Sequence, residues 1–197
     1  MKYPKEQKDY SKYWDFIMEK VHTQFYDKEN ITEEYVLKNF NLTNYNDYKI
    51  FIHVIGGEDN YGLKNVFCHM VDMNEDTKVI LTPWDLDTTY SYNWSGEGVT
   101  YLYEDPNAVT KIDGLLTNSE MLNHSLKERY FELRESVLSI ENIYKKIDSY
   151  YEQIKYAIHK ENSRWMMTDL KSEVNKIKEW YKMRVEFLDN YLGDNDV

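Results

Sequence analysis

The placement of glycine and proline constrains this 197-residue chain more than any other feature of its sequence. Six of the seven glycines and two of the three prolines fall between residues 56 and 114, whereas neither type occurs from Leu115 to Leu192. Glycine and proline are the strongest interrupters of regular structure, so long stretches without them favour helices. The sequence therefore predicts helices, then an irregular central region, then helices again.

Apolar residues spaced by three and four on either side of the central region are typical of amphipathic helices. The expected helices cover about residues 9–25, 45–55, 119–138, 140–159 and 164–192, with a short additional helix capped by Asn30 or Thr32. We expect Gly56 and Gly57 to end the helix at 45–55. The apolar run at 50–52 is also compatible with a strand.

The central region contains the only strand pattern that we expect to pair. Residues 66–71 alternate imperfectly between apolar and polar types, and residues 72–77 are turn formers. Residues 78–82 then have the composition of a second strand. We therefore expect a β-hairpin that ends just before Asp85 and Asp87.

Length and composition favour one domain of the α+β class, mainly α with a small β-hairpin. At about 150 residues per domain, 197 residues correspond to one domain or little more. Hydrophobic residues make up 42% of the chain and charged residues 30%, an ordinary globular balance. The expected parts of the single domain (1–197) are a helical lead-in at 1–55, the hairpin and site loops at 56–114, and a three-helix tail at 115–193.

Charge and hydropathy exclude several partners. Lys and Arg number 24 and Asp and Glu number 35, which gives a net charge of −11. An acidic chain repels phosphate backbones and anionic membranes, so we expect no nucleic-acid partner, whereas carboxylates can hold divalent cations. No apolar run approaches the roughly 18 residues of a membrane span, and the first residues lack the apolar core of a secretion signal.

Five polar residues of the central region are the candidates for chemistry. Asp59, Lys64 and Asn65 precede the first strand, and Asp85 and Asp87 follow the second. In phosphoryl transfer, one carboxylate deprotonates the attacking hydroxyl, while an amide and a second carboxylate hold the metal that bridges the phosphates. A hairpin brings its two ends together, so these side chains can meet. If Asp85 and Asp87 lay on a strand, they would face the same side and could share a cation.

Two other interpretations of the same residues remain open. Paired carboxylates such as Asp59 and Asp85 could act on or bind a glycan, with Trp94 and nearby tyrosines lining a groove. The carboxylates could instead be turn and capping residues of a non-catalytic helical interaction module, because aspartate commonly serves turns. Side chains scattered in space at these positions would contradict both catalytic interpretations.

We expect the remaining conspicuous residues to be structural. The five histidines lack the spacing of zinc ligands, and His53 and His69 on apolar elements are typical of hydrogen-bonded core residues. Trp84 is expected to pack beneath the carboxylates, and Cys68, the only cysteine, to be a buried, inert thiol. An aromatic-rich loop is expected to pack against the tail helices and contains Tyr90, Tyr92, Trp94, Tyr101 and Tyr103.

Three central segments resemble the CotH kinase-like family, named for a spore-coat protein H. They read IGGED at 55–59, KNVF at 64–67 and LTPWDLDTTY at 81–90, and the PWDLD run is the most distinctive. Three tail segments also resemble the family: LLTN at 115–118, KERY at 127–130 and SRW at 163–165, the last leading into a helix with Arg184. The resemblance spans roughly residues 32–192.

The family is similar to atypical protein kinases that phosphorylate Ser or Thr of spore-coat or secreted proteins. The resemblance therefore implies the C-lobe of a kinase-like fold, ATP with Mg or Mn as cofactor, and a protein substrate. It implies Asp59 as the catalytic residue, Asn65 and Asp85 as metal ligands, and Asp87 as an additional ligand. Lys64 and Asn65 would contact the cofactor.

A complete kinase also has an N-terminal lobe with a glycine loop over the phosphates and a Lys–Glu pair. The first 55 residues contain no glycine and have a mainly helical pattern. We therefore expect the N-lobe to be absent from this chain and supplied, if at all, by another. On that expectation the chain alone binds ATP weakly or not at all and has little phosphotransferase activity.

Overall fold

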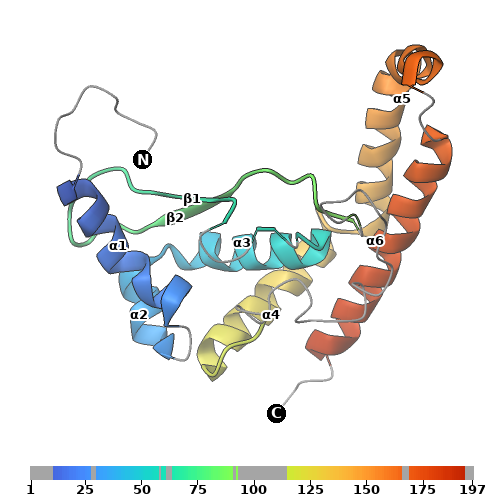
Figure 1. Ribbon diagram of the computed structural model, residues 1–197. Coiled ribbons are helices and arrows are strands. Elements are labelled where there is room, and N and C mark those ends of the chain that lie inside the picture. The colour runs from blue at the N-terminus through green and yellow to red at the C-terminus, as the bar shows by residue number, and fades with distance from the viewer. Residues whose placement is uncertain are drawn as a thin grey trace.

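The computed structural model describes residues 11–27, 30–57, 59–60, 64–90, 92, 115–165 and 169–193. Within these residues the chain is mainly helical with one small antiparallel sheet, as the sequence predicts (Figure 1). The elements in chain order are α1 (Ser11–Tyr26), α2 (Glu33–Asn39), α3 (Leu42–Ile55), β1 (Val66–His69), β2 (Ile80–Pro83), α4 (Glu120–Arg134), α5 (Ile140–Trp165) and α6 (Leu170–Gly193).

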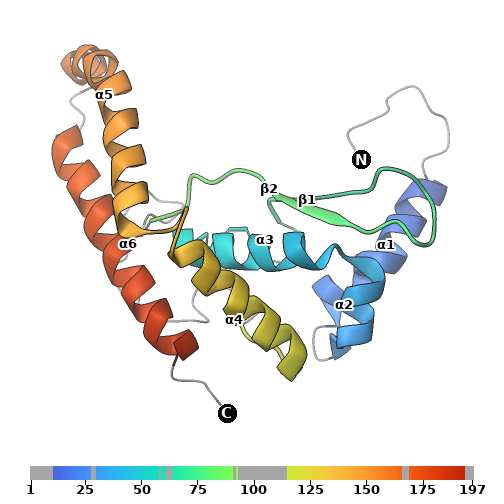
Figure 2. The same ribbon diagram turned by 180° about the vertical axis from the view of Figure 1, so that it is seen from behind.

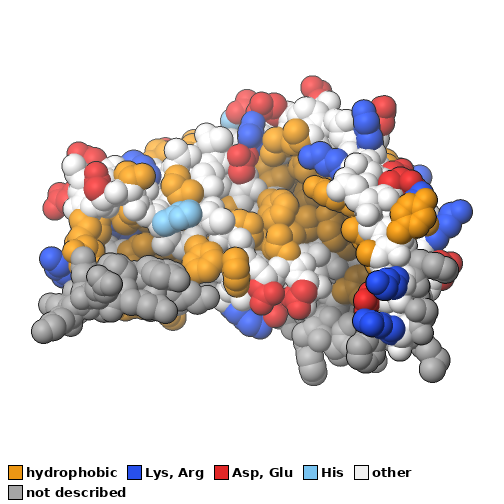
Figure 3. All heavy atoms as spheres, turned by 90° about the horizontal axis from the view of Figure 1, so that it is seen from above, with side chains coloured by type: hydrophobic (Ala, Val, Ile, Leu, Met, Phe, Trp, Pro, Cys, Tyr) orange, Lys and Arg blue, Asp and Glu red, His pale blue; other side chains and the backbone are white. Residues whose placement is uncertain are grey.

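Helix α3 runs through the middle of the molecule, and the other elements are arranged around it (Figures 1 and 2). The hairpin lies along one side of α3, α4 lies on the opposite side, and α1 and α2 cover one end. At the other end, α5 and α6 form an antiparallel pair that extends beyond the rest of the fold. Seen from above, the surface is hollowed beside this pair and lined by hydrophobic side chains (Figure 3).

One hydrophobic core joins the N-terminal helices to the inner face of the hairpin. Its buried members are Val21, Val36, Phe40, Tyr45, Val79, Leu81 and Leu122. Thr32 caps α2 as predicted, because its Oγ1 accepts a hydrogen bond of 3.2 Å from the backbone N–H of Tyr35. The short helix α2 is thereby fixed in place between α1 and the hairpin.

The edge of β2 is covered by the chain that leads into α3. The backbone N–H of Leu81 donates to Asn44 Oδ1 over 2.7 Å, and Asn44 Nδ2 donates back to the carbonyl of Leu81 over 3.0 Å. Phe40 forms an isolated parallel bridge with Val79. The side-chain amide of Asn44 thus makes the two hydrogen bonds that a third strand would make with Leu81, and it connects the hairpin to α3.

A second core joins α3, α4 and α6. Its buried members are Ile50, Val54, Leu115, Leu126, Tyr130, Tyr181, Val185, Leu188 and Leu192. At its edge, Arg134 makes a bidentate ion pair with Asp189 through N–O distances of 2.8 and 2.9 Å. Tyr130 Oη donates to the same carboxylate over 2.7 Å. This network fixes α4 against α6.

The helix predictions hold in number and approximate position, with one correction in the tail. The region at 50–52 is helical, and the helix that contains it begins at Leu42. The helix predicted at 164–192 begins at Leu170, because Arg164 belongs to the last turn of α5, which extends to Trp165. No helix among the described residues is long and apolar enough to cross a membrane.

Gly56 ends α3 in a left-handed conformation, with φ of 63°. The indole ring of Trp180 on α6 packs against this glycine so closely that a Cβ at position 56 would lie 2.7 Å from it. The buried guanidinium of Arg184 donates through Nε to the carbonyl of His53 over 2.8 Å, where the helix dipole favours a cation. Position 56 therefore requires glycine for both its backbone conformation and its contact.

We expect Gly56→Ala to lower the free energy of unfolding by about 3 kcal/mol, because a left-handed residue with a Cβ is strained and the indole must move. Urea denaturation of the variant and the wild type measures the difference. Gly193→Ala is the control, since nothing lies within 4 Å of a Cβ there; its effect should stay within about 0.5 kcal/mol. Equal losses in the two variants would contradict the packing argument.

Tyr35 joins α2 to α1, and its burial gives the fold a dependence on alkaline pH. Its hydroxyl donates to the carbonyl of Lys20 over 2.7 Å and accepts from the backbone N–H of Gln24 over 3.0 Å. Burial raises the pKa of Tyr35 from 10.0 to about 12. The stabilisation is therefore complete below pH 10, where the unfolded chain is also neutral, and is lost as pH rises towards 12.

We expect the free energy of unfolding of the wild type to fall between pH 10 and 12 more steeply than that of Tyr35→Phe. The phenylalanine variant has no proton to lose at this position, although it is less stable at pH 7 because both hydrogen bonds are gone. Urea denaturation at pH 8, 10 and 11 gives the two slopes. Parallel slopes would show that Tyr35 is not a source of the pH dependence.

Candidate functional site

The open end of the hairpin brings together residues that precede β1 and follow β2. The strands pair in antiparallel register from Val66 opposite Pro83 to His69 opposite Ile80. One step beyond the first pair, the backbone N–H of Trp84 donates to the carbonyl of Asn65 over 2.9 Å. Asn65 and Asp85 therefore lie at the same end of the sheet, away from the turn that joins the strands (Figure 1).

Both residues have left-handed backbone conformations, with φ of 53° at Asn65 and 57° at Asp85. Asparagine and aspartate tolerate this conformation better than any other residue with a side chain. Their residue types thus suit the backbone at the two ends of the hairpin. An amide and a carboxylate, both groups that can ligate a metal, therefore occur in the chain at the same end of the hairpin.

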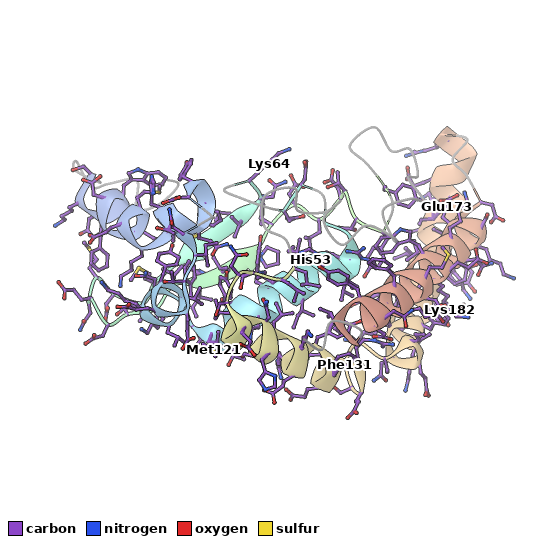
Figure 4. The ribbon with its side chains drawn as sticks, turned by 90° about the horizontal axis from the view of Figure 1, so that it is seen from below. His53, Lys64, Met121, Phe131, Glu173 and Lys182 are labelled. Atoms are coloured by element: carbon purple, nitrogen blue, oxygen red, sulfur yellow. The ribbon has the colours of Figure 1, made fainter. Side chains whose placement is uncertain are left out.

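Asp59 lies in a tight turn between α3 and this end of the hairpin. The turn is closed by the backbone N–H of Asn60, which donates to the carbonyl of Gly57 over 3.1 Å. Asp59 Oδ1 lies 2.7 Å from Lys64 Nζ, and their side chains are 29% and 66% exposed. Figure 4 shows Lys64 pointing away from the body of the molecule. Such an exposed ion pair contributes little to stability, so Lys64 can exchange Asp59 for another anion.

Asn60 is a site residue that sequence reasoning missed. It is fully buried, and its side-chain Nδ2 donates to the carbonyls of both Asn65 and Trp84, over 3.1 and 2.5 Å. The hydroxyl of Tyr48 on α3 donates to the backbone carbonyl of Asn60 over 2.5 Å. In the sequence, Asn60 is one polar residue in a polar loop, and no local pattern distinguishes it from an exposed one.

The described residues at this end of the hairpin include one amide and one carboxylate, Asn65 and Asp85. Among the described residues, no group of three or more His, Cys, Asp or Glu side chains could hold a metal ion. Mg²⁺ is commonly held by one or two carboxylates, with water and substrate phosphates completing its shell. Asp85 and Asn65 can supply such a partial set. Because β2 ends at Pro83, strand geometry does not place Asp85 and Asp87 on one side.

Comparison with known protein families identifies the family of the chain. Residues 1–188 match the family described as CotH kinase protein. The chain belongs to the CotH kinase family. A comparison with curated proteins found no matching sequence. The family match includes the turn with Asp59 and both ends of the hairpin, so the resemblance seen in the central segments extends over most of the chain.

In this CotH-family chain, Trp84 lies on the outer face of the hairpin, so the prediction that it packs beneath the carboxylates is wrong. Its side chain is 55% exposed rather than buried beneath the carboxylates, and it packs edge-to-face on Phe67, which is 39% exposed. Alternation along the strands explains the difference, because Val66 and Cys68 face the core while Phe67 faces outward. Hydrophobic side chains are visible on this side of the molecule in Figure 3.

The other structural expectations have mixed outcomes. His53 is buried as predicted (Figure 4), but His69 is exposed and contacts Thr82 Oγ1 through Nε2 at 2.7 Å. Cys68 is half-buried, and burial raises the pKa of its thiol to about 12, as expected of an inert cysteine. Of the five aromatic residues of the aromatic-rich loop, Trp94, Tyr101 and Tyr103 lie outside the described residues.

Two aromatic residues that follow the candidate site contact α6, as predicted. Tyr90 packs edge-to-face on Trp180 at a centroid distance of 5.7 Å, and its backbone N–H donates to the carbonyl of Ile55 over 2.7 Å. The hydroxyl of Tyr92 is hydrogen-bonded to Glu173. Tyr90 and Tyr92 therefore anchor the described chain that follows Asp87 to α6.

We expect Asp85→Asn to change the free energy of unfolding by less than about 0.5 kcal/mol, because asparagine tolerates the left-handed backbone. Asp85→Val should cost roughly 1–2 kcal/mol, because a β-branched residue is strained there. Urea denaturation of both variants tests this. If both variants matched the wild type, the positive φ at this position would not constrain the residue type.

Proposed function

We propose that this chain is the C-terminal lobe of a CotH-type protein kinase, which transfers the γ-phosphoryl group of ATP to Ser or Thr of a protein. The observation that supports the proposal is the gathering of Asp59, Asn65 and Asp85 around the open end of the hairpin. Asn60 connects all three, as the chain neighbour of Asp59 and the hydrogen-bond partner of the carbonyls of Asn65 and Trp84.

In this proposal Asp59 is the base. It accepts the proton of the acceptor hydroxyl, whose oxygen forms a bond to the γ-phosphorus while the bond from that phosphorus to the bridging oxygen breaks and ADP leaves. Lys64, now 2.7 Å from Asp59, is close enough to turn toward an incoming phosphate. That exchange would release the Asp59 carboxylate for the hydroxyl and place a cation beside the transferred group.

Asn65 and Asp85 are the proposed metal ligands, and Asp87, two residues further on, is a proposed additional ligand. When bound, Mg²⁺ or Mn²⁺ neutralises the charge that develops on the phosphate oxygens. Asp85 supplies a carboxylate and Asn65 an amide oxygen, which are ligand types that these cations accept. The acidic side chains at this end also favour a cation before any nucleotide arrives.

The chain before Asp59 supports the proposal that the N-lobe comes from elsewhere. Its described part is built of α1, α2 and α3, whose apolar faces pack in the two cores. Helices arranged in this way offer no strand-borne lysine or glycine loop over the phosphates. We infer that a further segment or a partner chain supplies these parts, and that this chain alone binds ATP weakly and transfers phosphate slowly.

The kinase proposal accounts for more of the geometry than either alternative. The glycan interpretation depended on a groove at Trp94, which lies outside the described residues. The interaction-module interpretation expected scattered residues, whereas the hydrogen bond from the Trp84 N–H to the Asn65 carbonyl brings Asn65 and Asp85 to one end of the hairpin. By family likeness, the acceptor protein would belong to the spore coat or be secreted.

We expect Asp85→Asn to weaken Mn²⁺ binding, measured without nucleotide, by at least about tenfold, since even indirect support of a metal ligand is worth 10–100-fold. Electron paramagnetic resonance of free Mn²⁺ measures the affinity. Asp76→Asn, an exposed carboxylate on the turn at the far end of the hairpin, is the control and should retain wild-type affinity. Unchanged Mn²⁺ binding by Asp85→Asn would refute the assignment of Asp85.

A further inference from the structure

We propose that Asn60 is a positioning residue that sets the relative orientation of Asn65 and Asp85. The inference rests on the proposed function for the role of these two side chains as cation ligands. It concerns a residue that does not itself contact the cation or the substrate.

The two hydrogen bonds of the Asn60 amide act on peptide groups that determine where the proposed ligands point. The carbonyl of Trp84 belongs to the peptide group that enters Asp85, so its orientation is coupled to the φ of 57° at Asp85. The carbonyl of Asn65 belongs to the peptide group that leaves Asn65. One amide therefore restrains the backbone next to both ligands, and both are in sparsely populated conformations that need such restraint.

The same carbonyl of Asn65 already accepts the backbone N–H of Trp84 over 2.9 Å, which closes the hairpin. The bonds from Asn60 do not themselves pair the strands, but they add to the stability of this end of the hairpin. Their further effect is to fix the hairpin end relative to the turn that carries Asp59. Base and ligands are thus linked through a single buried side chain.

Asn60 is itself held from two directions. The hydroxyl of Tyr48, on the rigid helix α3, donates to its carbonyl over 2.5 Å, and its own N–H bonds to Gly57. Gly57 leaves room for the side chain, because a Cβ there would lie 3.2 Å from Asn60 Oδ1 and 3.4 Å from Ile52 Cγ2. The helix, the turn and the hairpin end therefore meet at this residue.

The first test compares Asn60→Ala with Asn46→Ala. Asn46 is also a buried asparagine that joins two elements, since its Nδ2 donates to Ser125 Oγ over 3.0 Å, but it makes no described contact with the hairpin end. We expect Asn60→Ala to weaken Mn²⁺ binding, measured without nucleotide by electron paramagnetic resonance, by about tenfold or more. Asn46→Ala should retain wild-type affinity although it is also destabilised. Equal losses of affinity would overturn the proposal.

Tyr48→Phe provides a milder variant in case Asn60→Ala does not fold. It removes only the hydroxyl that donates to the Asn60 carbonyl. We expect its Mn²⁺ affinity to fall by about twofold to tenfold, the range set by one hydrogen bond. If Asn60→Ala does not fold, wild-type affinity in folded Tyr48→Phe would by itself refute the role of Asn60.

A metal-free measurement separates this inference from the proposed function. Amide hydrogen exchange by NMR reports on the Trp84 N–H, which is bonded to the Asn65 carbonyl. We expect its exchange to be at least about tenfold faster in Asn60→Ala, corresponding to the loss of roughly one hydrogen bond, and unchanged in Asn46→Ala. Unchanged exchange in Asn60→Ala overturns the inference. If the wild type binds no Mn²⁺ without nucleotide, the metal site of the proposed function fails, and the exchange result still decides whether Asn60 positions the hairpin end.

Discussion

Helix α3 is the element on which the rest of the structure depends. Its first turn holds the hairpin through the amide of Asn44, and its middle reaches the site turn through the hydroxyl of Tyr48. Its second half places Ile50 and Val54 in the core shared with α4 and α6. A two-stranded sheet is marginal by itself. The geometry at the open end of the hairpin is therefore fixed by packing on one helix.

Most of the fold could be predicted because its signals are local. Apolar periodicity and the glycines at 56 and 57 act within a few residues, and Thr32 caps the helix that follows it. The boundary near Arg164 was predicted wrongly because no local signal marks it. No glycine or proline marks the break between α5 and α6, and the apolar pattern continues across it, so only the packing of the two helices determines where each one ends.

The site could be predicted only in part. Hairpin geometry is local, and it is enough to bring Asn65 and Asp85 to the same end of the sheet. The burial of Asn60 and the exposure of Trp84 are consequences of tertiary structure: Tyr48 and the Asn65 carbonyl enclose the first, while the second lies against Phe67 on the outer face of the hairpin and stays 55% exposed. Residue type gives the opposite expectation in both cases, because asparagine is usually exposed and tryptophan largely buried.

The residue types at 65 and 85 have two possible causes, since a left-handed backbone favours asparagine and aspartate with or without a ligand. Asn60 helps to separate these causes. Burying an amide costs desolvation free energy, and the backbone bond between Trp84 and Asn65 already closes the strands. A fold that required only a closed hairpin would gain little from a second, buried donor. A fold that required two oxygen ligands at a defined orientation would gain rigidity where a cation needs it.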